Sequence, residues 1–148
     1  RVTYMGNPYS CAFSGKALTF FSSRNLASPE LVEQRNIEER IDSVFYSDEY
    51  AAAIVRNTNG EYGSRLEVYK KDGTHVLSKE FNFEYTHADF DGDLIILYNE
   101  DSCRIYNMSG TEKFDATFDF PVSKIRKGRF PGTLVVTGPQ QMQELKLR

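Results

Sequence analysis

Histidine is the side chain that most often moves protons near neutral pH, and this chain has only two, His75 and His87. Neither has a second ligand residue at the helical or hairpin spacing of a metal site. No serine lies in a nucleophile elbow, and no glycine-rich run precedes a helix to bind phosphate. The sequence therefore predicts that the protein is not an enzyme. His87 begins a predicted strand and could line a ligand or partner face, whereas a packed or solvated histidine is the simpler interpretation.

Asp89, Asp91 and Asp93 alternate, and Glu100 lies eleven residues after Asp89, which imitates the two ends of a calcium-binding loop. The glycine is Gly92, however, two positions before the place where that loop needs one. Residues 94–98 also read as a strand, so these carboxylates could not surround one ion. A hairpin turn with solvated carboxylates is therefore preferred to a metal site, and no cofactor is expected.

Lys124, Arg126, Lys127 and Arg129 form the densest basic stretch of a chain whose formal net charge is −3. They could contact an anionic wall polymer or lipid headgroups, since each cation near a charged surface contributes about 1 kcal/mol. A solvated strand and turn is the simpler interpretation. Proteins that bind nucleic acid are usually basic with a clustered patch, so nucleic acid is not an expected partner.

The cysteine and apolar content of the sequence limits which classes of protein it can belong to. Cys11 and Cys103 are too few for a disulfide framework. Cys103 begins a predicted strand and is interpreted as a small buried hydrophobic residue, with a bridge to Cys11 as the less favoured alternative. Apolar residues make up 40% of the chain, which is enough for a folded core. The sequence contains no apolar run of transmembrane length and no signal peptide.

The elements that would position these residues come from an internal repeat. LEVYKKDGT at residues 66–74 reappears 37 positions later as CRIYNMSGT at residues 103–111. The same offset relates residues 81–83 to residues 118–120. A fixed period of this length indicates repeated supersecondary units. The approximate units are 1–40, 41–83, 84–120 and 121–148.

Each unit reads as four strands joined by turns. Leu66 and Val68 alternate with Glu67 and Tyr69, the period of two expected of a strand with two distinct faces. The pairs Asp72-Gly73, Asp91-Gly92 and Ser109-Gly110 supply the positive φ of two-residue hairpin turns, and Asn59-Gly60 lies in a longer loop. Residues 29–40 are the one helix candidate, but they align better with the outer strand at residues 76–81.

Four antiparallel strands in about 40 residues are typical of a β-propeller blade, although a sandwich or an open meander remains an alternative. The chain would hold about three and a half blades, fewer than a closed ring. It is therefore interpreted as part of a longer propeller, and its exposed edges could pair with a second copy to form a homodimer. Phenylalanines recur where one sheet would pack on the next, at Phe45, Phe81, Phe83, Phe90, Phe114, Phe118 and Phe120.

Four segments carry a resemblance to a known family. ADFDGDLIILYN at residues 88–99 and CRIYNMSGTEKF at residues 103–114 resemble a family of uncharacterised Firmicute proteins, domain of unknown function 5711. SVFYSD at residues 43–48 and KIRKGRFP at residues 124–131 are similar to it as well. The likeness covers most of the chain, which would be the C-terminal part of the family. It implies a β-propeller with repeats of the WD40, TolB or PQQ kind.

The resemblance also implies a location. The parent protein would be held on the extracellular side of the bacterial cytoplasmic membrane by one N-terminal transmembrane helix. The family has no established catalytic residues to carry over. The first expectation is thus a non-catalytic scaffold that binds an unidentified protein at the cell surface. The alternative is a carbohydrate-binding or hydrolytic propeller whose site is shared with blades absent from this sequence.

Overall fold

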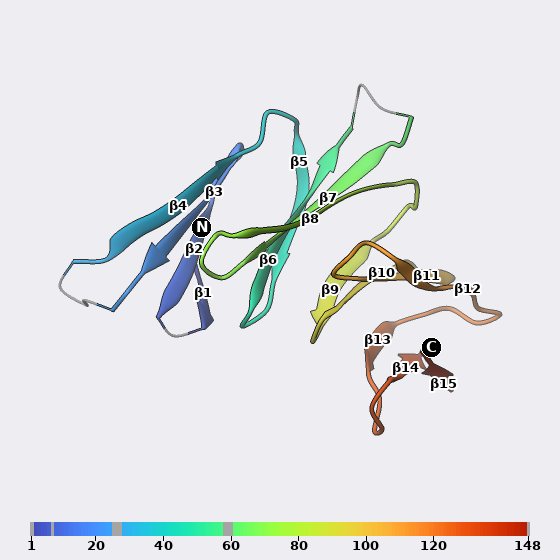
Figure 1. Cartoon of the computed structure of the whole chain (residues 1–148). Coiled ribbons are helices and arrows are strands. Elements are labelled where there is room, and N and C mark those ends of the chain that lie inside the picture. Colours follow the sequence, from blue (N-terminus) through green and yellow to red (C-terminus); the bar gives the residue numbers. More distant parts are fainter. Residues whose placement is uncertain (1, 7, 25–27, 58–60, 148) are drawn as a thin grey trace. The chain divides into compact units, whose positions relative to one another are not determined.

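The computed structural model describes residues 2–6, 8–24, 28–57 and 61–147, and within them it consists of strands and turns without a helix (Figure 1). Residues 30–36, in the one stretch considered for a helix, form an outer strand as the repeat alignment predicts. Asn59 and Gly60 lie outside the described residues.

Within the described residues, fifteen strands form four antiparallel sheets, each built from strands consecutive in the sequence. Blade 1 comprises β1 (Val2–Gly6), β2 (Tyr9–Phe13), β3 (Ala17–Ser22) and β4 (Glu30–Asn36). Blade 2 comprises β5 (Ile41–Tyr46), β6 (Tyr50–Arg56), β7 (Ser64–Lys70) and β8 (His75–Phe81). Blade 3 comprises β9 (His87–Asp91), β10 (Leu94–Tyr98), β11 (Ser102–Asn107) and β12 (Glu112–Thr117). Blade 4 comprises β13 (Lys124–Lys127), β14 (Thr133–Thr137) and β15 (Met142–Lys146).

The predicted all-β class and its four-stranded blades are therefore confirmed. Three blades have four strands and blade 4 has three, slightly more than the three and a half blades expected from the repeat. The chain divides into two compact units, residues 1–82 with blades 1 and 2 and residues 83–148 with blades 3 and 4.

The hairpin turns differ in length from the prediction. A two-residue turn does follow β9, but it is formed by Gly92 and Asp93, one residue later than the predicted pair Asp91-Gly92, and Gly92 has φ +57° in it. At the β7–β8 turn, however, Lys70 N–H donates to the Thr74 carbonyl and Gly73 N–H donates to the Lys70 carbonyl. This pattern is a three-residue loop that ends in a bulge, with Gly73 at φ +88°. The β11–β12 turn repeats it at Gly110, so glycine placement is predicted correctly and loop length is not.

Each unit has its own apolar core between its two blades. In the first unit, Leu18 and Phe20 of blade 1 pack against Ala51, Ala53 and Tyr69 of blade 2. In the second unit, the buried cluster comprises Ile96, Tyr98, Cys103, Ile105, Phe118, Val122, Ile125, Leu134, Val136 and Leu145. The two faces predicted for β7 are both covered, since its residues from Leu66 to Tyr69 are all buried and Tyr69 packs in the core shared with blade 1.

A polar cluster lies beside the core of the first unit. The Glu67 carboxylate accepts hydrogen bonds from Arg65 Nε at 2.8 Å and from the Ser78 hydroxyl, and it contacts His75 Nε2 at 2.9 Å. Arg65 also pairs with Glu39 at 2.8 Å, which raises the pKa of Arg65 and lowers the pKa of Glu39. Because Glu67 is 8% exposed, these partners replace the water that the carboxylate loses on folding.

The two cysteines lie in different units and are both free. Each is fully buried, as predicted for Cys103, and the less favoured bridge to Cys11 is absent. Burial raises the pKa of each thiol to about 12.

We therefore expect neither thiol to react with iodoacetamide at pH 8 while the protein is folded, because the reactive thiolate is scarce and the sulfur is inaccessible. Mass spectrometry after alkylation in buffer and in concentrated urea measures this. Both thiols should be modified in urea alone, and rapid modification of either one in buffer would contradict the burial.

Candidate partner-binding loops

The loops that could bind a partner gather at one end of the second unit. Strand direction alternates within each antiparallel blade, so the links after the second and the fourth strand share one end. In this unit those links are residues 99–101, 118–123 and 138–141. The turns of residues 92–93, 108–111 and 128–132 lie at the opposite end. The fold thus separates two sets of loops.

Backbone hydrogen bonds hold the first set in place. The amide of Phe118 donates to the Asp101 carbonyl at 2.7 Å, and the amide of Val122 donates to the Glu100 carbonyl at 2.6 Å. The 138–141 turn is closed by the Gly138 amide, which donates to the Gln141 carbonyl at 2.8 Å. Loops tied to their scaffold in this way lose little conformational entropy when a partner binds.

Gly138 lets two of these loops approach closely. A Cβ at this position would lie 2.6 Å from the Pro121 carbonyl oxygen and 2.7 Å from Cδ2 of Phe120. Both distances are shorter than van der Waals contact, so any larger residue would push the 118–123 link away from the 138–141 turn.

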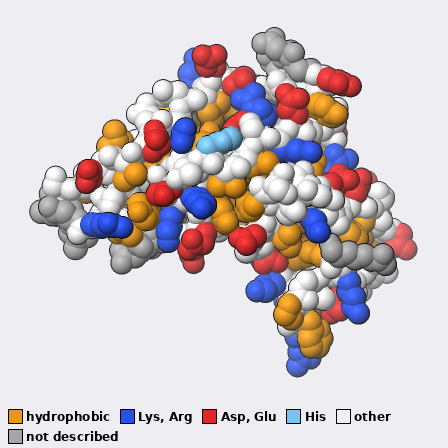
Figure 2. Space-filling view, in the orientation of Figure 1, with side chains coloured by type: hydrophobic (Ala, Val, Ile, Leu, Met, Phe, Trp, Pro, Cys, Tyr) orange, Lys and Arg blue, Asp and Glu red, His pale blue; other side chains and the backbone are white. Residues whose placement is uncertain are grey.

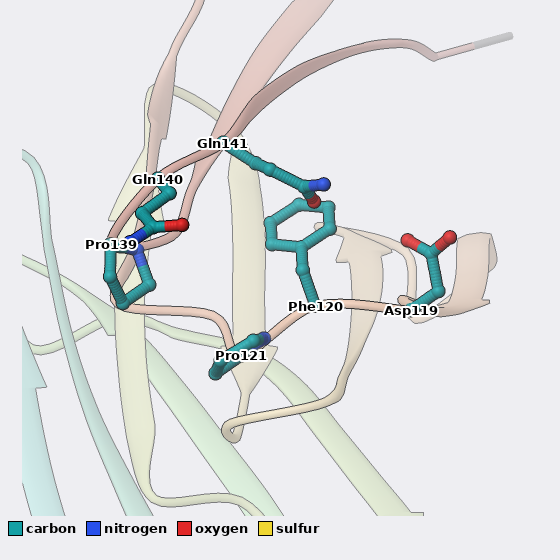
Figure 3. Close-up of a pocket in the computed structure, with 6 residues that line it drawn as sticks. All are labelled: Asp119, Phe120, Pro121, Pro139, Gln140 and Gln141. Atoms are coloured by element: carbon teal, nitrogen blue, oxygen red, sulfur yellow. The ribbon is translucent and has the colours of Figure 1, made fainter.

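A cavity of about 260 Å³ lies where these two loops meet, lined by Asp119, Phe120, Pro121, Pro139, Gln140 and Gln141 (Figure 3). The ring of Phe120 points toward the side chain of Gln141, and Pro139 and Gln140 lie across the space from the ring. The ring of Phe120 packs beside that of the buried Phe118, with the two ring centroids 5.8 Å apart.

The chemistry of this lining suits recognition. The aromatic and proline rings offer apolar surface, and the glutamine amides can donate and accept hydrogen bonds. The lining includes no histidine, cysteine or serine, and it has one carboxylate, Asp119, where glycoside hydrolysis uses a pair. The cavity can therefore hold an apolar group beside a polar backbone, but its own residues supply no nucleophile.

His87 lies apart from this cavity lining, at the start of the edge strand β9. Its ring stacks on that of Tyr98, with centroids 4.8 Å apart and planes 10° from parallel. Burial raises the pKa of Tyr98, the Asp89 charge adds to the rise, and a hydrogen bond with the Ile125 backbone opposes it. His87 is thus an exposed histidine packed on a tyrosine that links blade 3 to blade 4.

The three aspartates do not converge. Asp89 and Asp91 lie on β9, whereas Asp93 lies in the turn that follows it. The part of the chain that the structure describes contains no group of three His, Cys, Asp or Glu residues arranged to hold a metal ion. The structure shows the predicted hairpin at this position.

The basic residues follow blade 4 toward the end opposite the cavity. Lys124, Arg126 and Lys127 lie on β13, and Arg129 lies in the turn to β14. All four are exposed, and Arg126 contacts the sulfur of Met142 at 3.9 Å. None of them forms an ion pair with another described residue.

The cavity residues were not identified from the sequence as a site. Phe120 is expected there only to pack one sheet on the next, and it does contact the core of the second unit. The signal available is the run of residues 138–141, glycine, proline and two glutamines, in a link where blade 3 has Asn99 to Asp101 in its place. Of the residues that the structure describes, none forms a helix long and apolar enough to cross a membrane.

Solved structures similar to this chain are β-propellers. Hsv2p from Kluyveromyces lactis has 9% sequence identity and a TM-score of 0.59, over 100% of this chain and 46% of that one. BamB from Moraxella catarrhalis has 15% identity and a TM-score of 0.61, over 99% of this chain and 45% of that one. BBS1N, solved in complex with ARL6DN, has 15% identity and a TM-score of 0.57, over 99% of this chain and 49% of that one.

The chain therefore spans less than half the length of these propellers, and at such low identity the likeness shows the fold alone. No curated protein matches the chain. Residues 1–147 match a family model described as a family of unknown function, DUF5711.

Proposed function

The chain belongs to DUF5711, a family of unknown function. From the geometry of its loops, we propose that it is a non-catalytic β-propeller module that binds a protein partner. The observation that carries the proposal is the preformed cavity around Phe120 at the end where three links of the second unit gather. Propeller-like folds usually bind other molecules through loops that a rigid scaffold holds in place. BBS1N, a propeller neighbour, was solved in complex with ARL6DN, which supports this kind of role by analogy alone.

The location belongs to the same proposal. We place the module on the extracellular side of a bacterial cytoplasmic membrane, with the parent protein anchored by an N-terminal helix. The support is the resemblance of residues 88–99 and 103–114 to the family. Partner binding at the cell surface would then use the cavity end of the second unit.

Replacing Phe120 by alanine is expected to weaken capture of the partner at least tenfold, because the ring supplies the largest apolar surface of the cavity. The wild-type chain and the variant would be used as baits on solubilised membrane and cell-wall fractions, with quantitative mass spectrometry of what each retains. Gln141→Ala is a second variant that leaves the core packing untouched. Tyr62→Ala is the control, since Tyr62 is 41% exposed in the other unit.

The set of baits that retain a given protein tests the proposal. A protein held by wild type and Tyr62→Ala but released by both cavity variants would support it. Recovery of the chain itself as the sole partner would assign the loops to self-association between two copies. A protein retained equally by all four baits would overturn the role of the cavity.

A carbohydrate ligand is the second candidate, because an aromatic ring beside amides can also stack on a sugar ring. Binding of wall glycans that is lost in Phe120→Ala, without any protein captured, would favour it. The single carboxylate of the lining counts against hydrolysis in either case.

A further inference from the structure

A second surface lies at the far end of blade 4 from the cavity, at the β13–β14 hairpin of residues 128–132. Phe130 is 59% exposed there, although it is a large apolar side chain. It lies in the turn between β13 and β14, outside the apolar core that the described residues of this unit form. Figure 2 shows orange and blue side chains next to one another at the end of this hairpin.

The turn holds Phe130 rigidly. Its carbonyl accepts the Thr133 amide at 3.2 Å and the Thr133 hydroxyl at 2.6 Å. Pro131 and Gly132, the latter with φ +74°, occupy the two central positions, as in a type II turn. Gly128 permits the close approach of Thr133, because a Cβ there would overlap the Thr133 side chain. The exposed ring is therefore presented by a preformed tip.

Charge is segregated onto the same blade. Residues 124–146 contain five basic side chains and one acidic one, Glu144, whereas the whole chain has a formal net charge of −3. The cations flank the aromatic residue on the strand that leads to the tip and within the turn itself, at Lys124, Arg126, Lys127 and Arg129. Since none is paired with a described carboxylate, their charge is available to an external anion.

We propose that this hairpin docks on an anionic lipid bilayer, with Phe130 entering the interface and the flanking cations contacting the headgroups. Aromatic side chains partition to the boundary between headgroups and acyl chains. Cations near an anionic surface add to the attraction, each by a modest amount. A soluble anionic polymer would use the cations but would leave the ring in water, so the exposed Phe130 favours the bilayer.

The absence of tryptophan from the chain makes the test direct. Phe130→Trp would place a single fluorescent reporter at the tip, and Tyr62→Trp would place one at a control site that is 41% exposed. With vesicles of equal parts phosphatidylcholine and phosphatidylglycerol, we expect the tip reporter alone to shift to the blue and to be quenched by brominated acyl chains. Vesicles of pure phosphatidylcholine should produce a much smaller change.

Two variants separate the contribution of the aromatic ring to vesicle binding from that of the cations. Phe130→Ala should weaken vesicle co-sedimentation about tenfold, the loss expected for one aromatic ring returned to water. Lys127→Gln with Arg129→Gln should weaken it about thirtyfold and reduce its salt dependence by about half, since two of the four cations remain. Circular dichroism would show that both variants remain folded, since the replaced side chains are exposed.

The proposal is independent of the cavity, and Phe120→Ala should sediment with vesicles as wild type does. Quenching of the tip reporter by brominated lipid supports docking. If the fluorescence of the Phe130→Trp reporter is neither shifted nor quenched, the proposal is overturned. This holds even if the protein sediments with the vesicles, because binding would then depend on charge alone. Equal binding to a soluble polyanion and to vesicles, with no effect of Phe130→Ala, would also overturn it.

Discussion

Replacing Glu67 by alanine is expected to lower the free energy of unfolding by about 3 kcal/mol. The Glu67 carboxylate is buried and has three polar partners, Arg65, His75 and Ser78. Its removal leaves the guanidinium of Arg65 in a half-buried position with Glu39 as the remaining partner. A buried group that loses its partner keeps the full cost of leaving water, and that cost exceeds the gain from the original bond.

The measurement is urea unfolding followed by circular dichroism, with Glu49→Ala as the matched control. Glu49 also forms an ion pair, with Lys71 at 3.3 Å, but its side chain is 66% exposed. Exposed pairs contribute at most about 1 kcal/mol because water screens them. A loss in Glu67→Ala no larger than that in Glu49→Ala would show that the cluster is not energetically coupled to the fold.

Replacing Gly138 by alanine should cost about 2 kcal/mol of stability and weaken partner binding at least tenfold. The added methyl group would overlap the Pro121 carbonyl and the ring edge of Phe120, so one of the two loops must move. That movement changes the width of the cavity directly, because both loops line it. A single methyl group would thus affect folding and recognition together.

Gly15→Ala provides the control for this substitution. Its Cβ would meet no atom within 4 Å, and neither glycine has a positive φ. Alanine at residue 15 should therefore be neutral or slightly stabilising, through the lower entropy of the unfolded chain. The comparison uses urea midpoints and the bait assay described for Phe120→Ala. Equal midpoints for the two alanine variants would mean that the loops do not pack as closely as the structure places them.

The fold was predictable because its signals are local. The 37-residue period, the alternation within strands and the glycines at turns can each be read from a few neighbouring residues. Positive φ at Gly73, Gly92 and Gly110 follows directly from them. The length of the turns does not follow from these signals, because Gly92 begins a two-residue turn whereas Gly73 and Gly110 end three-residue loops, although each follows an aspartate or a serine.

The candidate site was not predictable because it is a tertiary property. Phe120 and Pro139 come from different links and meet only after blades 3 and 4 have packed. The alternation of Glu67 with Val68 predicts two distinct faces for β7, but it does not reveal that both faces are buried, because that depends on how the blades pack. Charge segregation on blade 4 was visible in the sequence, but the exposure of Phe130 was not.

The consecutive order of strands in every sheet has a consequence for synthesis. Each hairpin closes a short stretch of chain, so contact order within a blade is low and little loop-closure entropy opposes its formation. A nascent chain could complete blade 1 before β5 has left the ribosome, and blade 2 would then condense on the surface of blade 1, as blade 4 would on that of blade 3. Folding within each unit would then follow the order of synthesis, one blade after the other.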